Sequence, residues 1–287
     1  MKKLDVPTTD DESAFIGLVN NTRLKSFPHL KDLVVPVRAA YKAYKDSFDS
    51  PIFVFRPPTN DQAAYLLGHF NSPPKDIGFI KAMRKVSDSR ECSMCGSLHS
   101  GTLDHYLSKN TFPQFAVFSK NLVPACKCNS KRGEKLHGDQ PGERILHPYY
   151  DECMNERIVR AQFDDLGAVP RVSLELTIPR THVQYAAISF HVREIIQKSA
   201  IKGYLADRWS NLFRKPSLAV RAFEKNFVTE ADVQRALSAE LAKLDDSHGG
   251  KNNWNSVFVR GLLEPPTLAW LTSRLSNTVR PADAPLG

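Results

Sequence analysis

The chain has 287 residues, of which 41% are hydrophobic and 24% are charged, so collagen-like, coiled-coil and mostly disordered proteins are excluded. This length allows one large domain or two modest ones, each able to bury a core without disulfides. Lysine and arginine outnumber acidic residues by 39 to 31, giving a formal net charge of +8. That excess is typical of a protein that meets polyanions, and also of an ordinary basic soluble protein.

No apolar run reaches the roughly 18–20 residues that a membrane span needs. The first thirteen residues, MKKLDVPTTDDES, contain acids and a proline but no apolar stretch of the kind found in secretory signals. We therefore expect a cytoplasmic protein with no membrane contact.

Residues 1–90 are predicted to form a mainly helical N-terminal region. Apolar residues recur there at helical spacing, and proline-rich segments separate the repeats. The expected helices cover residues 12–24, 35–48, 61–70 and 78–87.

Residues 91–150 lose this periodicity and contain most of the cysteines and many turn-forming residues. Two strand-like pieces are expected at residues 101–107 and 115–123, and a short helix could begin in 128–136. The predicted fold class is accordingly α+β, with a small unit inserted between two mainly helical regions.

Residues 151–287 form the second helical region, with a regulatory role or a role in binding nucleic acid or a partner. Alternating polar and apolar residues predict strands at 157–163 and 170–178, within 157–178. A helix is expected over 182–213, a capping box before a helix at 231–244, a loop at 245–253, and a further helix around 255–263.

Four of the five cysteines form two close pairs, Cys92-x2-Cys95 and Cys126-x-Cys128. Two such pairs around a short segment can supply four thiolates to a tetrahedral zinc ion, although four reduced thiols without a metal are the alternative. His99 could replace one sulfur if the tight second pair binds through a single cysteine. The fifth cysteine, Cys153, is expected to be a small buried apolar residue.

Between the cysteine pairs stand Asp104-His105, then Asn121-Leu122 leading into Pro124-Ala125-Cys126, and then Cys128-Asn129. In this order, over roughly residues 90–150, the set resembles the HNH endonucleases, whose active site is a ββα-metal unit. The flanking cysteines match the zinc-bound subset of that family. The resemblance therefore implies a zinc-stapled ββα-metal unit.

The resemblance assigns His105 as the general base and Asp104 and Asn129 as ligands of one catalytic Mg²⁺ or Mn²⁺. Oxygen ligands suit such hard cations, and an imidazole can accept a proton from water near neutral pH. Asn121 matches the residue that orders the loop and supports the base. A backbone carbonyl within residues 121–124 is expected to fix the tautomer of the base, and the zinc is expected to be structural.

Four bases follow or flank the last cysteine, and they are expected to contact phosphates: Lys127, Lys131, Arg132 and Lys135. Arg132 stands where the family commonly has lysine, and Ser108 stands where it often has proline. His147, in the segment ILHPYYD, either supports the site or is a packed structural histidine.

The sequence thus predicts a metal-dependent HNH endonuclease that hydrolyses phosphodiester bonds of DNA, by nicking or by double-strand cleavage. The whole chain is similar to stand-alone HNH effectors of bacterial anti-phage defence, such as those of the Zorya, Septu and retron systems. This similarity implies protein partners and gating of the nuclease by a partner or by the chain itself. Two alternatives are a zinc-stabilised nucleic-acid-binding module that does not cut and a zinc protein that mediates assembly.

Overall fold

The computed structural model describes residues 1–48, 56–87, 91–276 and 279–287, and the expected boundary at residue 90 lies outside them. The described chain combines helices with two small antiparallel sheets, as the α+β prediction requires. The α-helices are α1 (Asp11–Asn20), α2 (Val34–Lys42), α3 (Asn60–Asn71), α4 (Phe79–Ser87), α5 (Lys127–Lys131), α6 (Tyr185–His191), α7 (Ile201–Arg214), α8 (Glu230–His248), α9 (Trp254–Leu262) and α10 (Pro265–Leu275).

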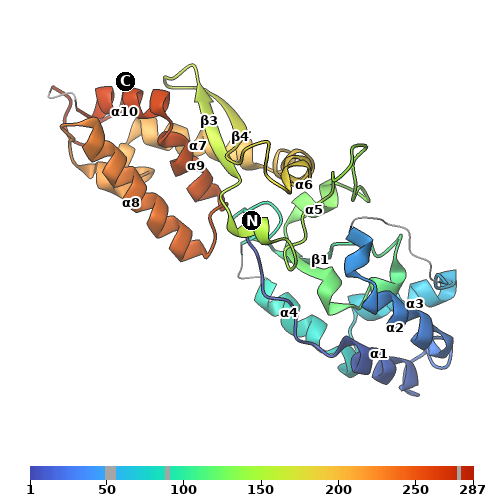
Figure 1. The fold of residues 1–287 in the computed structure, drawn as a ribbon. Helices are drawn as coiled ribbons and strands as arrows, with labels where there is room; N and C mark the ends of the chain where they lie inside the picture. Colours follow the sequence, from blue (N-terminus) through green and yellow to red (C-terminus); the bar gives the residue numbers. More distant parts are fainter. Residues whose placement is uncertain (49–55, 88–90, 277–278) are drawn as a thin grey trace.

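The strands form two hairpins in different parts of the molecule. They are β1 (Thr102–His105), β2 (Leu122–Ala125), β3 (Val159–Asp164) and β4 (Arg171–Leu176). Hairpin β1–β2 lies between helices α1–α4 on one side and the assembly of β3, β4 and α6–α10 on the other (Figure 1). Short 3₁₀ helices occur at Lys31–Leu33, Lys45–Phe48, Lys75–Ile77, Pro113–Phe115, Ser119–Asn121, Glu152–Asn155, Pro216–Leu218 and Arg221–Glu224.

The N-terminal helices form at the places that the apolar spacing predicts. The side chain of Asp10 caps α1 by accepting from the Ser13 amide, and Thr59 with Gln62 makes a capping box at the start of α3. Helix α1 ends at Asn20, four residues earlier than predicted, because the amide of the next residue bonds back to the Leu18 carbonyl.

Hairpin β1–β2 is shared between two hydrophobic cores. Leu103 and Leu122 pack into the core of the N-terminal helices, whereas Val123 and Ala125 belong to the larger core that continues into the C-terminal half. This follows from the strand period of two, since neighbouring residues of a strand point to opposite faces. The register pairs Thr102 with Ala125, Leu103 with Pro124, Asp104 with Val123 and His105 with Leu122.

The predicted strand over residues 115–123 is wrong for most of its length. This segment folds into two 3₁₀ turns, and strand geometry begins only at Leu122. Pro113 starts the first turn, and a buried carboxylate holds the second: Asp11 accepts from the amide and hydroxyl of Ser119 at 2.8 and 2.7 Å. These long-range contacts outweigh the β-propensity of the apolar residues.

The C-terminal half confirms both predicted strands and corrects the helices. β3 and β4 pair antiparallel, and α9 packs against β3. The predicted helix over 182–213 is divided: α6 continues into a π-helix at Val192–Ile196, and a turn separates it from α7. Helix α8 runs through the first part of the predicted 245–253 loop and ends at His248, where Gly249, with a φ of +57°, provides a left-handed cap. Helix α10 was not predicted.

His191 ties three segments together inside the larger core. Its Nδ1 accepts from the Leu146 amide at 3.1 Å, so the ring proton is on Nε2, which lies 2.7 Å from the Met94 carbonyl. Both ring nitrogens are thus used by the neutral imidazole. Burial lowers the pKa of His191 to about 4 and the pKa of the equally buried His147 to about 3.

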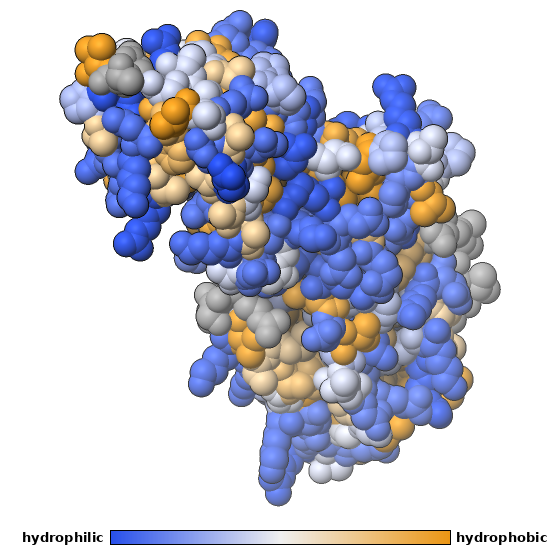
Figure 2. Space-filling view, turned by 60° about the vertical axis from the view of Figure 1, so that its left-hand side comes forward, coloured by the Kyte–Doolittle hydropathy of each residue, from blue (hydrophilic) through white to orange (hydrophobic). Residues whose placement is uncertain are grey.

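The face shown in Figure 2 is largely hydrophilic, with hydrophobic residues in small scattered groups. Within the described residues, no helix combines the length and apolar character that crossing a bilayer requires.

The buried neutral histidines predict that acid destabilises the fold. The pKa of such a histidine is lower in the folded protein than its ordinary value of 6.5. The stability that it contributes is fully present above pH 6.5 and is lost as the pH falls toward the pKa of the folded protein. At about pH 5 the loss is roughly 2 kcal/mol for each such histidine. Denaturant unfolding at about pH 7 and pH 5 should therefore show a smaller pH dependence for His191→Asn than for the native chain.

The exposed His99 provides the control, because His99→Asn should leave the pH dependence unchanged. An unaltered pH dependence in His191→Asn would contradict the assignment of His191 as a buried neutral residue.

Candidate metal centre and active site

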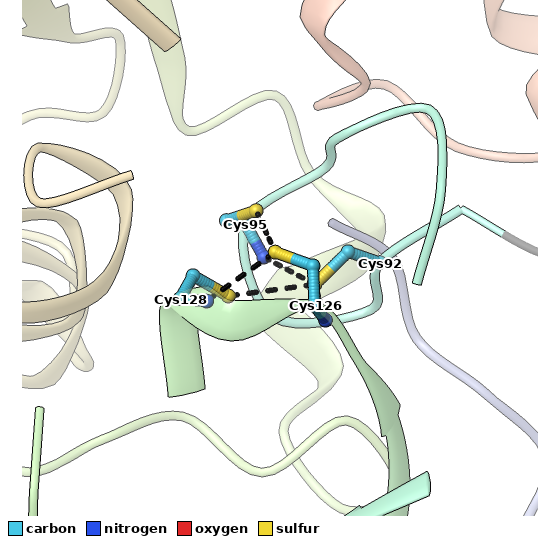
Figure 3. Close-up of side chains that lie close together, drawn as sticks. All are labelled: Cys92, Cys95, Cys126 and Cys128. Carbon is cyan, nitrogen blue, oxygen red and sulfur yellow. Dashed lines mark hydrogen bonds between the residues drawn. The ribbon is translucent and has the colours of Figure 1, made fainter. Parts of the chain in front are cut away.

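The four paired cysteines converge on one point. Cys92 and Cys95 lie in a loop after α4, whereas Cys126 and Cys128 lie at the junction of β2 and α5, and all four sulfurs point inward (Figure 3). Their ligand atoms lie within 4.8 Å of one another, with Sγ–Sγ distances of 3.5 Å for Cys92–Cys128 and for Cys95–Cys126. The cluster can therefore hold a metal ion.

The local backbone is shaped for this convergence. Amides of Cys95 and Cys126 point at the Cys92 sulfur at 3.4 and 3.3 Å, and the amide of Cys128 points at the Cys126 sulfur at 3.4 Å. Gly96 closes the first loop with a φ of +78°, and a Cβ there would lie 2.0 Å from the Asn252 carbonyl oxygen. Only glycine satisfies both conditions.

Zinc fits these four sulfurs. A tetrahedral zinc with Zn–S bonds of ~2.3 Å places its sulfurs about 3.8 Å apart, close to the 3.5 Å pairs seen here. His99 is exposed and is not part of the cluster. The structure therefore brings four cysteines together rather than three cysteines and His99. Cys153 is buried elsewhere, and burial raises the pKa of its thiol to about 12.

The cysteine loop is also fixed to the C-terminal half. The Trp254 indole donates to the Cys95 carbonyl at 2.8 Å, and the Trp254 amide donates to the Gly96 carbonyl at 3.0 Å. With the contact of His191 to Met94, these bonds link α6 and α9 to the first pair of cysteines.

Asp104 and His105 end strand β1 and face a small opening beside α5. The opening has a volume of about 130 Å³ and is lined by Asp104, His105, Ser108, Lys109, Asn110, Asn129, Ser130, Arg132 and Gly133. Asp104 is partly exposed there, and its two oxygens accept from the His105 amide at 2.8 Å and from Asn129 Nδ2 at 2.9 Å. A larger cavity of about 650 Å³ lies between the first residues and α4 and contains none of these residues.

The imidazole of His105 is buried and oriented by a backbone carbonyl. Its Nε2 lies 2.9 Å from the Ala116 carbonyl, and the ring meets Phe70 edge-on at 4.3 Å between centroids. The expected carbonyl was one from residues 121–124, and the structure instead supplies one from the preceding turn. Burial lowers the pKa of His105 to about 4, and the bond to Ala116 opposes this shift. The ring is therefore neutral at pH 7.

Asn129 connects the helix to the strand. Its Nδ2 donates to Asp104 and to the His105 carbonyl at 3.0 Å, and its Oδ1 accepts from Arg132 Nε at 2.8 Å. Arg132 is buried, and its other nitrogens bond the carbonyls of Lys135 and Tyr106. Arg132, which the sequence predicted to bind phosphate, is therefore buried and hydrogen-bonded to the backbone of its own chain.

Asn121 ties the loop after β1 to the turn before β2. Its Oδ1 accepts from the Leu107 amide at 2.7 Å, and its Nδ2 donates to the carbonyls of Leu107 and Phe115. Asn121 thereby holds the two segments that carry His105 and the Ala116 carbonyl.

A buried relay joins His147 to Asn121. The Tyr149 amide donates to His147 Nδ1 at 3.1 Å, so the proton of the ring is on Nε2, 3.1 Å from the Tyr44 hydroxyl. Tyr44 in turn donates to Asn121 Oδ1 at 2.8 Å. His147 is fully buried, and its ring also packs against Tyr106, with 4.1 Å between the ring centroids.

The remaining predicted phosphate contacts lie at the surface near α5. Lys127, Lys131 and Lys135 are exposed, with Lys131 bonded to the Lys198 carbonyl and Lys135 paired with Glu194. Sequence reasoning did not identify Tyr44, Phe70, Arg84 or Lys109 as neighbours of the site. Tyr44, Phe70 and Arg84 reach the site because the N-terminal region folds onto the hairpin. No local sequence motif predicts this.

Comparisons with known proteins give two partial matches. The chain is 36% identical over 82 residues to protein ea31 of Escherichia phage lambda and 32% identical over 83 residues to Septu protein PtuB of Bacillus thuringiensis. Each match covers 27% of this chain, 28% of ea31 and 31% of PtuB, so the chain spans less than a third of the curated relatives it matches. No protein-family model and no solved structure matches.

The cysteine cluster predicts one zinc per chain and a fold that depends on it. Cys128→Ser removes one thiolate, so the purified protein should carry less zinc by elemental analysis and should unfold at a lower temperature, because metal binding contributes directly to folding. Cys153→Ser serves as the matched control and should retain the full zinc content. Equal zinc content in both variants would exclude the cluster as the metal site.

The relay predicts that two neighbouring tyrosines respond differently to loss of the hydroxyl. Tyr44→Phe removes the buried hydrogen bonds of the hydroxyl to His147 and Asn121 and should cost about 1–3 kcal/mol of unfolding free energy. The buried hydroxyl of Tyr41, one helical turn earlier, has no hydrogen-bond partner among the described residues. Tyr41→Phe should therefore leave the denaturant midpoint unchanged or raise it, and equal losses in both variants would contradict the relay.

Proposed function

We propose that this protein is a metal-dependent endonuclease of the HNH type that hydrolyses phosphodiester bonds of DNA. One observation carries the proposal: an Asp-His pair at a strand end faces an opening, beside a helix that begins within a four-cysteine cluster. Two strands, a short helix and a sulfur cluster match the zinc-stapled ββα-metal unit that the sequence predicts.

His105 is the general base of this proposal. Because the Ala116 carbonyl can only accept, Nε2 carries the proton of the neutral ring and Nδ1 carries the free lone pair. A water beside Nδ1 loses its proton to the imidazole as it attacks phosphorus. The low pKa keeps the ring neutral, as a base requires, while Phe70 excludes solvent from one side.

Asp104 is the first ligand of the proposed divalent cation. Its carboxylate lines the opening, and each oxygen accepts one hydrogen bond from the described part of the chain, which leaves lone pairs for a hard cation and its waters. Bound Mg²⁺ or Mn²⁺ would supply charge stabilisation for the leaving 3′ oxygen. Asn129 would hold the same cation through its amide oxygen, which would require the amide to rotate so that the oxygen faces Asp104 instead of Arg132.

The second candidate function is a zinc-stabilised module that binds nucleic acid without cutting it. The observation that favours it is the bond between Asn129 Oδ1 and Arg132 Nε, because that bond occupies the oxygen expected to bind the catalytic cation. The proposed endonuclease requires this bond to open, whereas a binding module does not.

A role in anti-phage defence completes the proposal, and the match to a Septu protein supports it. The flanking helical regions would then contact protein partners or control access to the site.

Cleavage of supercoiled plasmid tests the proposal. The native chain should nick or linearise the plasmid with Mg²⁺ or Mn²⁺, and His105→Ala should lower the rate by about 10²–10⁴-fold, the usual contribution of a general base. Asp104→Asn should require more divalent cation. His99→Ala, outside the opening, should cut like the native chain.

A native chain that binds plasmid but never cuts it with either cation, alone or with its genomic neighbours' products, would favour the binding module. Equal cutting by His105→Ala would remove His105 from the mechanism.

A further inference from the structure

We infer that Arg84 and Lys109 form a subsite for the backbone phosphates of the nucleic acid beside His105. This inference deepens the proposed function by naming the part of the substrate that the N-terminal helices hold. Both cations lie over the ring of Phe70, with the Arg84 guanidinium carbon 4.6 Å and the Lys109 ammonium 4.8 Å from its centroid. The edge-on contact of Phe70 with His105 places all three beside the base.

The Arg84 guanidinium is held in place before any ligand arrives. Its Nη2 donates to the Phe70 carbonyl at 2.5 Å and its Nη1 to the Asn71 carbonyl at 3.2 Å, at the end of α3. A guanidinium has five N–H groups, so several remain for an anion. Because the fork is already oriented, little side-chain entropy is lost when a phosphate binds.

Neither cation is neutralised within the described part of the chain. No carboxylate there lies within ion-pair distance of Arg84 or Lys109. By contrast, Lys135, which follows α5, forms an ion pair with Glu194. Two uncompensated cations beside a neutral base are the arrangement that a polyanion can occupy.

The geometry distinguishes this subsite from the basic residues predicted from the sequence. Lys127 and Lys131 lie on α5, whereas Arg84 lies on α4 and Phe70 on α3, outside residues 91–150. Lys109 lines the same opening as Asp104. A nucleic-acid strand crossing the opening would therefore meet cations from both α5 and the N-terminal helices. This gives the N-terminal region a substrate-binding role.

Fluorescence anisotropy of a short labelled DNA duplex tests the subsite, with catalytic cations omitted so that binding is read without cleavage. Arg84→Gln and Lys109→Gln should each weaken binding about fivefold or more at moderate salt. Each should also reduce the slope of log affinity against log salt by about one, because each removes one phosphate contact. The same measurement with an RNA duplex shows whether these contacts to the phosphate backbone also bind RNA.

Arg274→Gln is the matched control, since Arg274 also stacks on an aromatic ring, 5.7 Å from the centroid of Trp270 on α10. It should bind DNA like the native chain. Lys109 lies in a loop, so Lys109→Gln tests the subsite even if Arg84→Gln, on helix α4, fails to fold.

The subsite would be overturned if both variants kept the salt dependence of DNA affinity seen for the native chain. It would also be overturned if the native chain bound neither DNA nor RNA at low salt. Binding that depends on Arg84 and Lys109 in a chain that never cuts would instead preserve the subsite and refute the nuclease.

Discussion

The convergence of four sulfurs is the constraint on which the rest of the site depends. The segments 92–95 and 126–128 are too short and too rich in turns to form a core of their own, and their sulfurs define the point where they meet. The second pair fixes the end of β2 and the start of α5, and so fixes Asn129 against Asp104. The first pair is fixed to α9 through Trp254. A metal at this point would thus join the candidate active site to both halves of the molecule.

A second set of contacts, made without sulfur, determines the orientation of the candidate base. Asn121 joins the loop after β1 to the turn that ends at Ala116, and Tyr44 and His147 support Asn121 from the larger core. These groups are buried and hydrogen-bonded, so breaking one leaves others unsatisfied at considerable cost. The position of His105 is therefore set by the packing of distant segments as much as by its own strand.

The sequence predicted the parts of this structure that depend on local pattern. Helical spacing located α1–α4, alternation located β3 and β4, and cysteine spacing located the four-sulfur cluster that can hold a metal ion. It failed where long-range contacts decide the conformation. Apolar residues at 115–118 resemble a strand, yet Asp11, more than a hundred residues earlier, holds Ser119 in a turn. Arg132 resembles a surface base, yet the carbonyls around it place it inside, and no local property of the sequence reveals those partners.

In the proposed nuclease, one divalent cation at Asp104 and one phosphate beside His105 meet in the opening next to α5. A crystal structure of the chain with Mn²⁺ and a DNA duplex, measured at the manganese and zinc absorption edges, tests it most directly. We expect a zinc signal among the four cysteines, a manganese signal at the Asp104 carboxylate, and a backbone phosphate between that ion and His105 Nδ1. Manganese bound elsewhere, or DNA lying away from the opening, would contradict it.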